Sequence, residues 1–291
     1  MRSQFGWRSL CAVIAVLGLN GSASMATLDS AALKHEHAGE LFSSVSSKCI
    51  DGVLTGGNST GKYKEIDGVN LYLAYPPKKK PEVAILYLTD IFGVQLVNNR
   101  LLADSFALAG YLVVVPDLFE GDPVPADALS NPASGFNLTA WSAIHTPAKT
   151  DAIINSTINS IRSNLGVSKI GGAGYCFGGK YVARFLAPGK GLDAGFTAHP
   201  SSVVAAEWQG ISKPLSIAFG ALDASNTPAQ RAAAEATFQG KNVTYQTTLY
   251  SNAEHGFAVR TDLSIPEKRF AQESAYFQAV RWFDAWLKTK K

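Results

Sequence analysis

The chain has 291 residues, of which 46% are hydrophobic and 17% charged, and its formal net charge is +3. A charge this close to neutral argues against nucleic acid as a partner. Beyond the N-terminal region, no stretch is long and apolar enough to cross a bilayer, so we also expect no membrane partner.

The first residues have the pattern of a secretory signal. Arg2 and Arg8 give a positive start, an apolar run covers 10–19, and Ser24-Met25-Ala26 forms a small-x-small cleavage site. We therefore predict a signal peptide over 1–26 and a secreted, extracellular protein. An uncleaved membrane anchor is the alternative, and the shortness of the apolar run argues against it.

The rest of the chain is long enough for one well-filled α/β domain and short for two. Residues 27–48 show no sustained hydrophobic period and are predicted to form a loosely ordered lead-in. The domain is accordingly predicted to span 49–291, and we expect a monomer. Four N-x-S/T sequons are compatible with a secreted glycoprotein: Asn58, Asn137, Asn155 and Asn242.

Strand and helix patterns alternate through the domain. Continuous apolar runs such as 83–88 are typical of parallel strands that are covered on both faces. The alternation predicts an α/β fold, a single-domain, mainly parallel sheet flanked by helices. The expected strands are 69–75, 83–88, 111–115, 168–173, 194–198, 214–219 and 243–250, and the expected helices are 98–108, 148–165, 180–186, 228–238 and 267–288. Segment 119–146 resembles a covering excursion, and whether it forms a lid stays open.

The segment Gly174-Tyr175-Cys176-Phe177-Gly178-Gly179 lies between an expected strand and an expected helix. A nucleophile on such a sharp turn needs small residues two positions to either side, and Gly174 and Gly178 meet that need. The following helix would favour a thiolate through its amide dipoles. The segment therefore predicts a nucleophile elbow centred on Cys176.

Two other interpretations of this segment exist. A glycine-rich phosphate loop would use the G-x-G that begins at Gly172, but Phe177 occupies the position of the third glycine. A buried structural cysteine is the commonest fate of a free thiol. Pairing with Cys49 is conceivable in a secreted chain, although a disulfide would silence the elbow. The pairing state of Cys49 stays open.

The strands that follow the elbow end in two further candidate residues. Ligand crevices in such sheets lie beyond the carboxyl ends of the strands, and Asp223 and His255 follow two of them. The order Cys176, Asp223, His255 is the nucleophile, acid, base order of α/β-hydrolases. Glu254 is a rival for a role in the site, and so is His199, for which a pocket-lining or structural role is expected.

An oxyanion hole would combine the amide of the residue after the nucleophile with an amide from the loop after an early strand. These are the backbone amides of Phe177 and Ile91. No metal site is expected, because the two histidines at His35 and His37 lack further ligands at metal-binding spacing.

Several motifs together resemble the dienelactone hydrolase family, and they occur in the family's order over most of the domain. These are Asp90-Ile91-Phe92-Gly93-Val94, Pro116-Asp117-Leu118-Phe119, the elbow with Lys180, and His255-Gly256-Phe257 with Arg260. The resemblance implies a single-domain α/β-hydrolase with a Cys-Asp-His triad and no cofactor. It also implies an enzyme of the carboxymethylenebutenolidase type, which opens a lactone or cleaves an ester of a small molecule.

The chain departs from the bacterial pattern at two substrate-facing positions. Asp90 stands where the bacterial members have a glutamate that holds the resting thiol, and Glu120-Gly121-Asp122 stands where they have an arginine. Arg260 is left as the matched arginine, so the resemblance implies substrate binding by Asp90 and Arg260. Dienelactone as the substrate stays open. A retired α/β-hydrolase that binds a small molecule is the alternative from another class, and a redox role for Cys176 is a more distant one.

Overall fold

A computed structural model describes residue 53 and residues 55–77, 81–129 and 131–288 of the chain. The predicted signal peptide, the lead-in over 27–48 and Cys49 lie outside the described residues. No helix in the described ranges is both long and apolar enough to pass through a bilayer.

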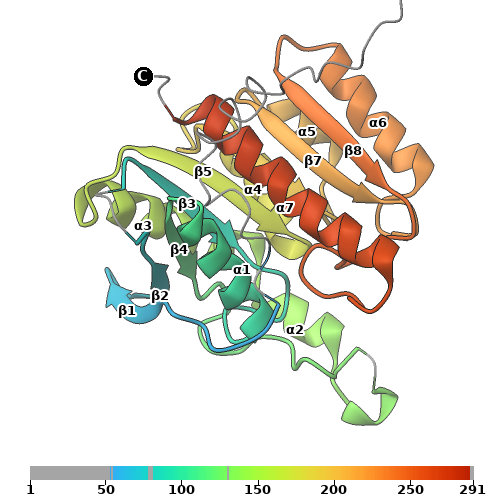
Figure 1. Cartoon of the computed structure of the whole chain (residues 1–291), viewed down its shortest axis with the longest axis horizontal. Helices are drawn as coiled ribbons and strands as arrows, with labels where there is room; N and C mark the ends of the chain where they lie inside the picture. Colours follow the sequence, from blue (N-terminus) through green and yellow to red (C-terminus); the bar gives the residue numbers. More distant parts are fainter. Residues whose placement is uncertain (1–52, 54, 78–80, 130, 289–291) are drawn as a thin grey trace, which may run out of the picture. The chain divides into compact units, whose positions relative to one another are not determined.

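An eight-stranded sheet lies at the centre of the described domain, with the strand order β1-β2-β4-β3-β5-β6-β7-β8 (Figure 1). Every neighbouring pair from β4 to β8 in this order is parallel, whereas β2 is antiparallel to both of its neighbours. This confirms the predicted mainly parallel sheet. The strands are β1 (Lys62–Ile66), β2 (Val69–Ala74), β3 (Val83–Leu88), β4 (Leu112–Pro116), β5 (Lys169–Tyr175), β6 (Ala194–Ala198), β7 (Leu215–Gly220) and β8 (Tyr245–Tyr250).

Helices pack against both faces of the sheet and create two separate cores. Strand β3 shows the cause, because Ile85 and Tyr87 point into one core while Leu86 and Leu88 point into the other. The first core is closed by α1 (Val97–Leu108) and α7 (Pro266–Trp286), which lie in front of the sheet in Figure 1. The second core is closed by α3 (Pro147–Ser163), α4 (Phe177–Phe185), α5 (Ala205–Gly210) and α6 (Pro228–Gln239).

The structure differs from the sequence prediction in a few elements. Strand β1 was not predicted, because its first four side chains are exposed and leave no alternating pattern. The six-residue helix α5 was missed as well, and α4 begins at Phe177 rather than at 180. In the last helix Phe270 is 68% exposed, whereas alanines such as Ala271 and Ala275 face the core.

The excursion over 119–146 contains the short helix α2 (Leu138–Ile144) and packs onto the elbow helix through aromatic side chains. Trp141 lies 5.0 Å from the ring of Phe119, and Phe119 lies 5.2 Å from the ring of Phe177. The Trp141 indole N–H donates to the carbonyl of Asp122 at 2.8 Å. These contacts place the base of the excursion directly beside the residue that follows Cys176.

Candidate active site

Cys176 lies on the turn between β5 and α4, with φ 52° and ψ −111°. Such a conformation is strained for a residue with a side chain, and it is the geometry expected of a nucleophile elbow. A Cβ atom on Gly178 would collide with the carbonyl oxygen of Leu88, and one on Gly174 would lie 2.5 Å from the carbonyl oxygen of Gly178. The two glycines are therefore required by the close approach of strand, loop and helix.

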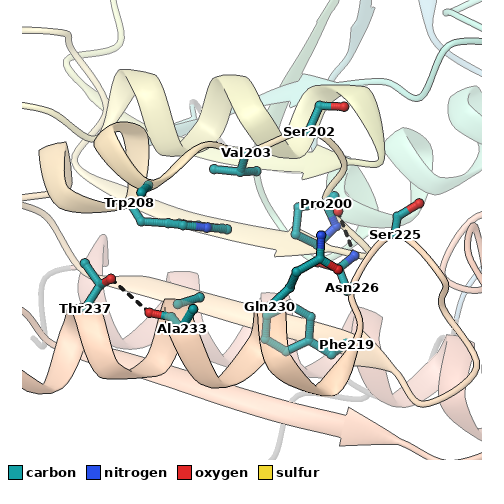
Figure 2. Close-up of a pocket in the computed structure, with 12 residues that line it drawn as sticks. Pro200, Ser202, Val203, Trp208, Phe219, Ser225, Asn226, Gln230, Ala233 and Thr237 are labelled. Carbon is teal, nitrogen blue, oxygen red and sulfur yellow. Dashed lines mark hydrogen bonds between the residues drawn. The ribbon is translucent and has the colours of Figure 1, made fainter.

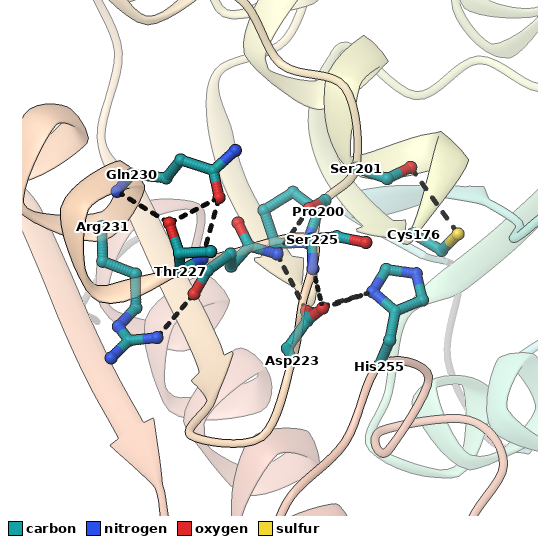
Figure 3. A network of polar contacts seen from close by, with 10 residues as sticks. Cys176, Pro200, Ser201, Asp223, Ser225, Thr227, Gln230, Arg231 and His255 are labelled. Carbon is teal, nitrogen blue, oxygen red and sulfur yellow. Dashed lines mark hydrogen bonds and ion pairs between the residues drawn. The ribbon is translucent and has the colours of Figure 1, made fainter.

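His255 and Asp223 lie beside the thiol, as Figure 3 shows. The ring nitrogen Nδ1 of His255 lies 3.0 Å from both carboxylate oxygens of Asp223. The other edge of the ring faces Cys176. The structure thus brings together the three residues that the sequence predicted. We call Cys176, His255 and Asp223 the candidate triad.

The electrostatics of this arrangement favour a charged imidazole. Burial alone lowers the pKa of His255, but the hydrogen bonds to Asp223 and Cys176 outweigh it and raise the pKa to about 10. Burial likewise acts to raise the pKa of Asp223, and its hydrogen bonds, first to His255, bring the net shift below the ordinary value. A proton that reaches His255 is therefore well stabilised there.

Asp223 is fixed by two neighbours that the sequence analysis did not single out. Its carboxylate accepts from the backbone N–H of Ser225 at 2.8 Å and from the side-chain amide of Asn226 at 2.9 Å. The same amide of Asn226 donates to the carbonyl of Pro200 at 2.7 Å. Both contacts come from the loop after β7, so an inspection of residues near each strand end could have found them.

The loop after β3 lies against the start of α4, as an oxyanion hole requires. Gly178 donates its N–H to the carbonyl of Thr89 at 3.0 Å and thereby joins the two segments. Phe177 occupies the first turn of α4, where backbone N–H groups have no helical partner. Within the described ranges, no hydrogen bond uses the backbone N–H of Ile91 or of Phe177, so both predicted donors are free to serve a ligand.

Asp90 and Arg260 contact each other, and in the described part of the chain no hydrogen bond joins Asp90 to Cys176. Arg260 donates to Asp90 at 3.2 Å, and its guanidinium lies 4.4 Å from the ring centre of Phe92. Asn99 also donates to Asp90, at 2.9 Å. Burial raises the pKa of Asp90 despite these donors. Asp90 is thus engaged in holding Arg260, whose side chain is 35% exposed.

Glu254 and His199, the two rivals for a role in the site, make contacts different from those of the candidate triad. Glu254 pairs with Lys268 at 2.9 Å and accepts from Thr261, so it is occupied away from the thiol. His199 is fully buried, and its ring centre lies 5.2 Å from that of His255. Burial lowers the pKa of His199 well below the ordinary value, and the nearby His255 adds to this shift. His199 is therefore a neutral packing neighbour of His255, as its expected structural role requires.

A cavity of about 250 Å³ lies between α5 and α6 (Figure 2). Trp208 and Phe219 form its apolar walls, and Pro200, Asn226 and Gln230 supply polar or backbone edges. Cys176, His255 and Asp223 are not among the residues that line it. Among the described residues, no group of three or more metal-binding side chains is found.

The chain is similar to known proteins over most of its length. The model of the dienelactone hydrolase family matches residues 69–287. "Hydrolase pyvD" of Aspergillus violaceofuscus is 45% identical over 240 residues, which cover 82% of this chain and 96% of that protein. "Dienlactone hydrolase 1" of Gibberella moniliformis is 32% identical over 246 residues, which cover 82% of this chain and 93% of that protein.

Solved structures share the fold at lower identity. A putative dienelactone hydrolase from Klebsiella pneumoniae has a TM-score of 0.62 and 19% identity, covering 77% of this chain and 98% of that one. Family membership follows from the family match and from the relatives of 45% and 32% identity. The chain belongs to the dienelactone hydrolase family of the α/β-hydrolase superfamily, and it is a hydrolase.

Proposed function

We propose that the protein is a cysteine-dependent hydrolase that cleaves an ester or lactone bond of a small molecule through Cys176, His255 and Asp223. The observation that carries this proposal is the strained elbow cysteine whose thiol faces a histidine held by a buried aspartate. The names of two groups of relatives support the substrate class: "Dienlactone hydrolase" and "Carboxymethylenebutenolidase homolog".

The first half of the reaction forms an acyl-enzyme. His255 takes the thiol proton, and the Sγ of Cys176 attacks the carbonyl carbon of the ester. The negative charge that develops on the carbonyl oxygen is stabilised by the free N–H groups of Ile91 and Phe177. Collapse of the tetrahedral intermediate breaks the carbon–oxygen bond of the ester, and His255 returns its proton to the leaving alkoxide.

The second half uses water. His255 removes a proton from a water molecule, which attacks the thioester carbonyl in the same oxyanion site. The carbon–sulfur bond then breaks, and the released thiolate is again paired with protonated His255. Asp223 holds the ring by its Nδ1 through both halves and stabilises the charged imidazole, so the proton steps need no rearrangement.

Arg260 is the residue that we propose for substrate recognition. Its guanidinium is partly exposed and is held by Asp90 and by the ring of Phe92, which limits the orientations that it can adopt. A fixed guanidinium suits a carboxylate on the substrate. The preferred substrate is thus an ester or lactone that also carries an acidic group, and dienelactone is one such molecule.

Cys176→Ala tests the proposal. Turnover of p-nitrophenyl acetate and of a dienelactone should fall to the background rate, while the thermal unfolding midpoint stays within a few degrees. Cys49→Ser is the matched control, and it should retain activity. Retained esterase activity in Cys176→Ala would falsify the mechanism. Wild-type protein that is inactive on both substrates would instead favour the retired α/β-hydrolase that binds a small molecule.

We further propose that the protein is secreted and glycosylated, as the N-terminal pattern and the sequons suggest. The side chains of Asn58, Asn137, Asn155 and Asn242 are exposed, which supports their access to the glycosylation machinery. Expression in a eukaryotic host should place the protein in the medium, with a new N-terminus near residue 27 and a mass that falls on treatment with an N-glycosidase. Retention inside the cell with an intact N-terminus contradicts this proposal.

A further inference from the structure

Three consecutive residues after β6 contact the candidate triad or a residue that holds it. Ser201 donates its backbone N–H to the carbonyl of Cys176 at 3.0 Å, and its Oγ lies 3.7 Å from the Sγ of Cys176 (Figure 3). The carbonyl of Pro200 accepts the Asn226 amide that also holds Asp223. The ring of His199 packs edge to face on His255, with an interplanar angle of 69°. We call His199-Pro200-Ser201 the support loop.

The backbone is strained at the first residue of this loop and at the residue that follows it. His199 has φ 39° and Ser202 has φ 55°, and each such conformation costs a non-glycine residue free energy. Tertiary contacts hold the backbone in this conformation. The backbone N–H of His199 donates to the carbonyl of Ala218 at 2.9 Å, and the side chain of Lys180 donates to the carbonyl of Ser202 at 3.2 Å. Strain that the surroundings maintain at this cost points to a role for the conformation, which here is the placement of Ser201.

The hydroxyl of Ser201 can donate a hydrogen bond, which a carboxylate cannot do. Asp90 accepts from Arg260, Asn99 and the backbone of Phe92, so it is committed elsewhere. The sulfur of Cys176 lies 3.7 Å from the Ser201 hydroxyl, and the ring of His255 faces it from another side. After His255 has taken the thiol proton, Ser201 is the side chain that can donate to the sulfur from a second direction.

We propose that Ser201 is a positioning residue for the nucleophile: its Oγ–H donates to the Sγ of Cys176, stabilises the thiolate and keeps the sulfur directed toward His255. This inference rests on the proposed function, because it assigns a role in the same site. The hydroxyl keeps its proton throughout, and the thiol proton still goes to His255. When Sγ bonds to the acyl carbon, this hydrogen bond weakens, and it forms again when the acyl group is released.

The test compares Ser201→Ala with two controls. Ser201→Thr keeps the hydroxyl, and Ser202→Ala removes the neighbouring hydroxyl, which is exposed and not in contact with the sulfur. The full-length protein is treated with iodoacetamide between pH 5 and pH 9, and alkylation of the peptide that contains Cys176 is followed by mass spectrometry. Because only the peptide that contains Cys176 is followed, alkylation of Cys49 does not affect the result. The kcat and KM for p-nitrophenyl acetate and the unfolding midpoint are measured for the same variants.

In Ser201→Ala we expect the pH midpoint of alkylation to rise by about 0.5–1 and alkylation at pH 7 to slow by up to about 3-fold to 10-fold. The value of kcat should fall by a similar factor with KM unchanged, while both controls stay within about 2-fold of the wild type. An alkylation profile that superimposes on that of the wild type overturns the inference. The inference is also overturned if the alkylation rate and kcat fall only because the unfolding midpoint is lower, while the pH profile of alkylation is not shifted. Turnover by Cys176→Ala would sink the proposed function separately, since the alkylation experiment does not depend on turnover.

Discussion

Two buried carboxylates in this molecule have nearly the same surroundings but different basic partners. Asp223 accepts from an asparagine amide, from the backbone N–H two residues later and from a basic side chain, His255. Asp90 accepts the same three kinds of donor, with Arg260 as the basic side chain. Both side chains are fully buried, and both follow a parallel strand.

The pKa shifts of the two carboxylates nevertheless have opposite signs. Burial dominates at Asp90 and raises its pKa, whereas the bonds to His255 and its neighbours win at Asp223 and lower its pKa. The two carboxylates also differ in what their basic partners can do. His255 can take and release a proton and faces the thiol, but an arginine stays charged and can only bind. The basic partner, rather than the carboxylate, therefore decides which pair can take part in proton transfer.

The strongest test of this contrast is Asp223→Asn. The amide cannot stabilise a charged imidazole, and it favours the wrong ring tautomer, so kcat for p-nitrophenyl acetate should fall by about 10³-fold to 10⁴-fold. Steady-state kinetics would measure this, with circular dichroism as the control for folding. A fall of less than 10-fold would mean that the two carboxylates are not functionally distinct.

Arg260→Ala should separate binding from chemistry. Loss of a charge-assisted contact to a substrate carboxylate is expected to lower kcat/KM for a carboxylate-bearing ester by about 10-fold to 100-fold. Turnover of the neutral p-nitrophenyl acetate should change by less than about 3-fold, because this ester carries no carboxylate for Arg260 to bind. Arg269→Ala, on the exposed start of α7, serves as the matched control. Equal losses on both esters would contradict a role in recognition.

The pH dependence of stability should carry the signature of the His255–Asp223 pair. The raised pKa of His255 means that its contribution is complete below about pH 6.5 and is lost as the pH rises toward about 10. The lowered pKa of Asp223 means that its contribution is present above about pH 3.8 and is lost in acid.

Urea unfolding can measure this signature in the wild type and in Asp223→Asn. The difference in unfolding free energy should be largest between about pH 4 and pH 6.5, on the order of 2–4 kcal/mol, and should shrink toward pH 10. A difference that is constant across this range would show that the pair does not titrate as a unit.

Asp90→Asn should have the smallest effect. Since burial already disfavours the charge on Asp90, the neutral amide costs little there, and the partly exposed Arg260 can turn to solvent. We expect kcat for p-nitrophenyl acetate to change by less than about 3-fold and the unfolding free energy by about 1–2 kcal/mol. A collapse of kcat comparable to that of Asp223→Asn would show that Asp90 acts on the thiol after all.

Much of the fold could be predicted because it depends on local patterns. The apolar run of β3 and the alternation of strands and helices gave the sheet and its helical layers with small errors at the ends. Strand β1 was missed because it is held by pairing with β2 and leaves four side chains in solvent. Helix α5 is too short to show a period.

The candidate site likewise has features that the sequence predicts and features that only the tertiary structure decides. Its residues could be predicted from the sequence, because the glycines of the elbow and the order of Cys176, Asp223 and His255 after β5, β7 and β8 are sequence properties. The bonding partners were decided by tertiary structure alone. Asp90 binds an arginine 170 positions away, and the Ser201 hydroxyl reaches Cys176 only because the loop after β6 passes over the elbow. Parallel strands bring their carboxyl ends to one edge of a sheet, but the folded loops determine which side chains meet there.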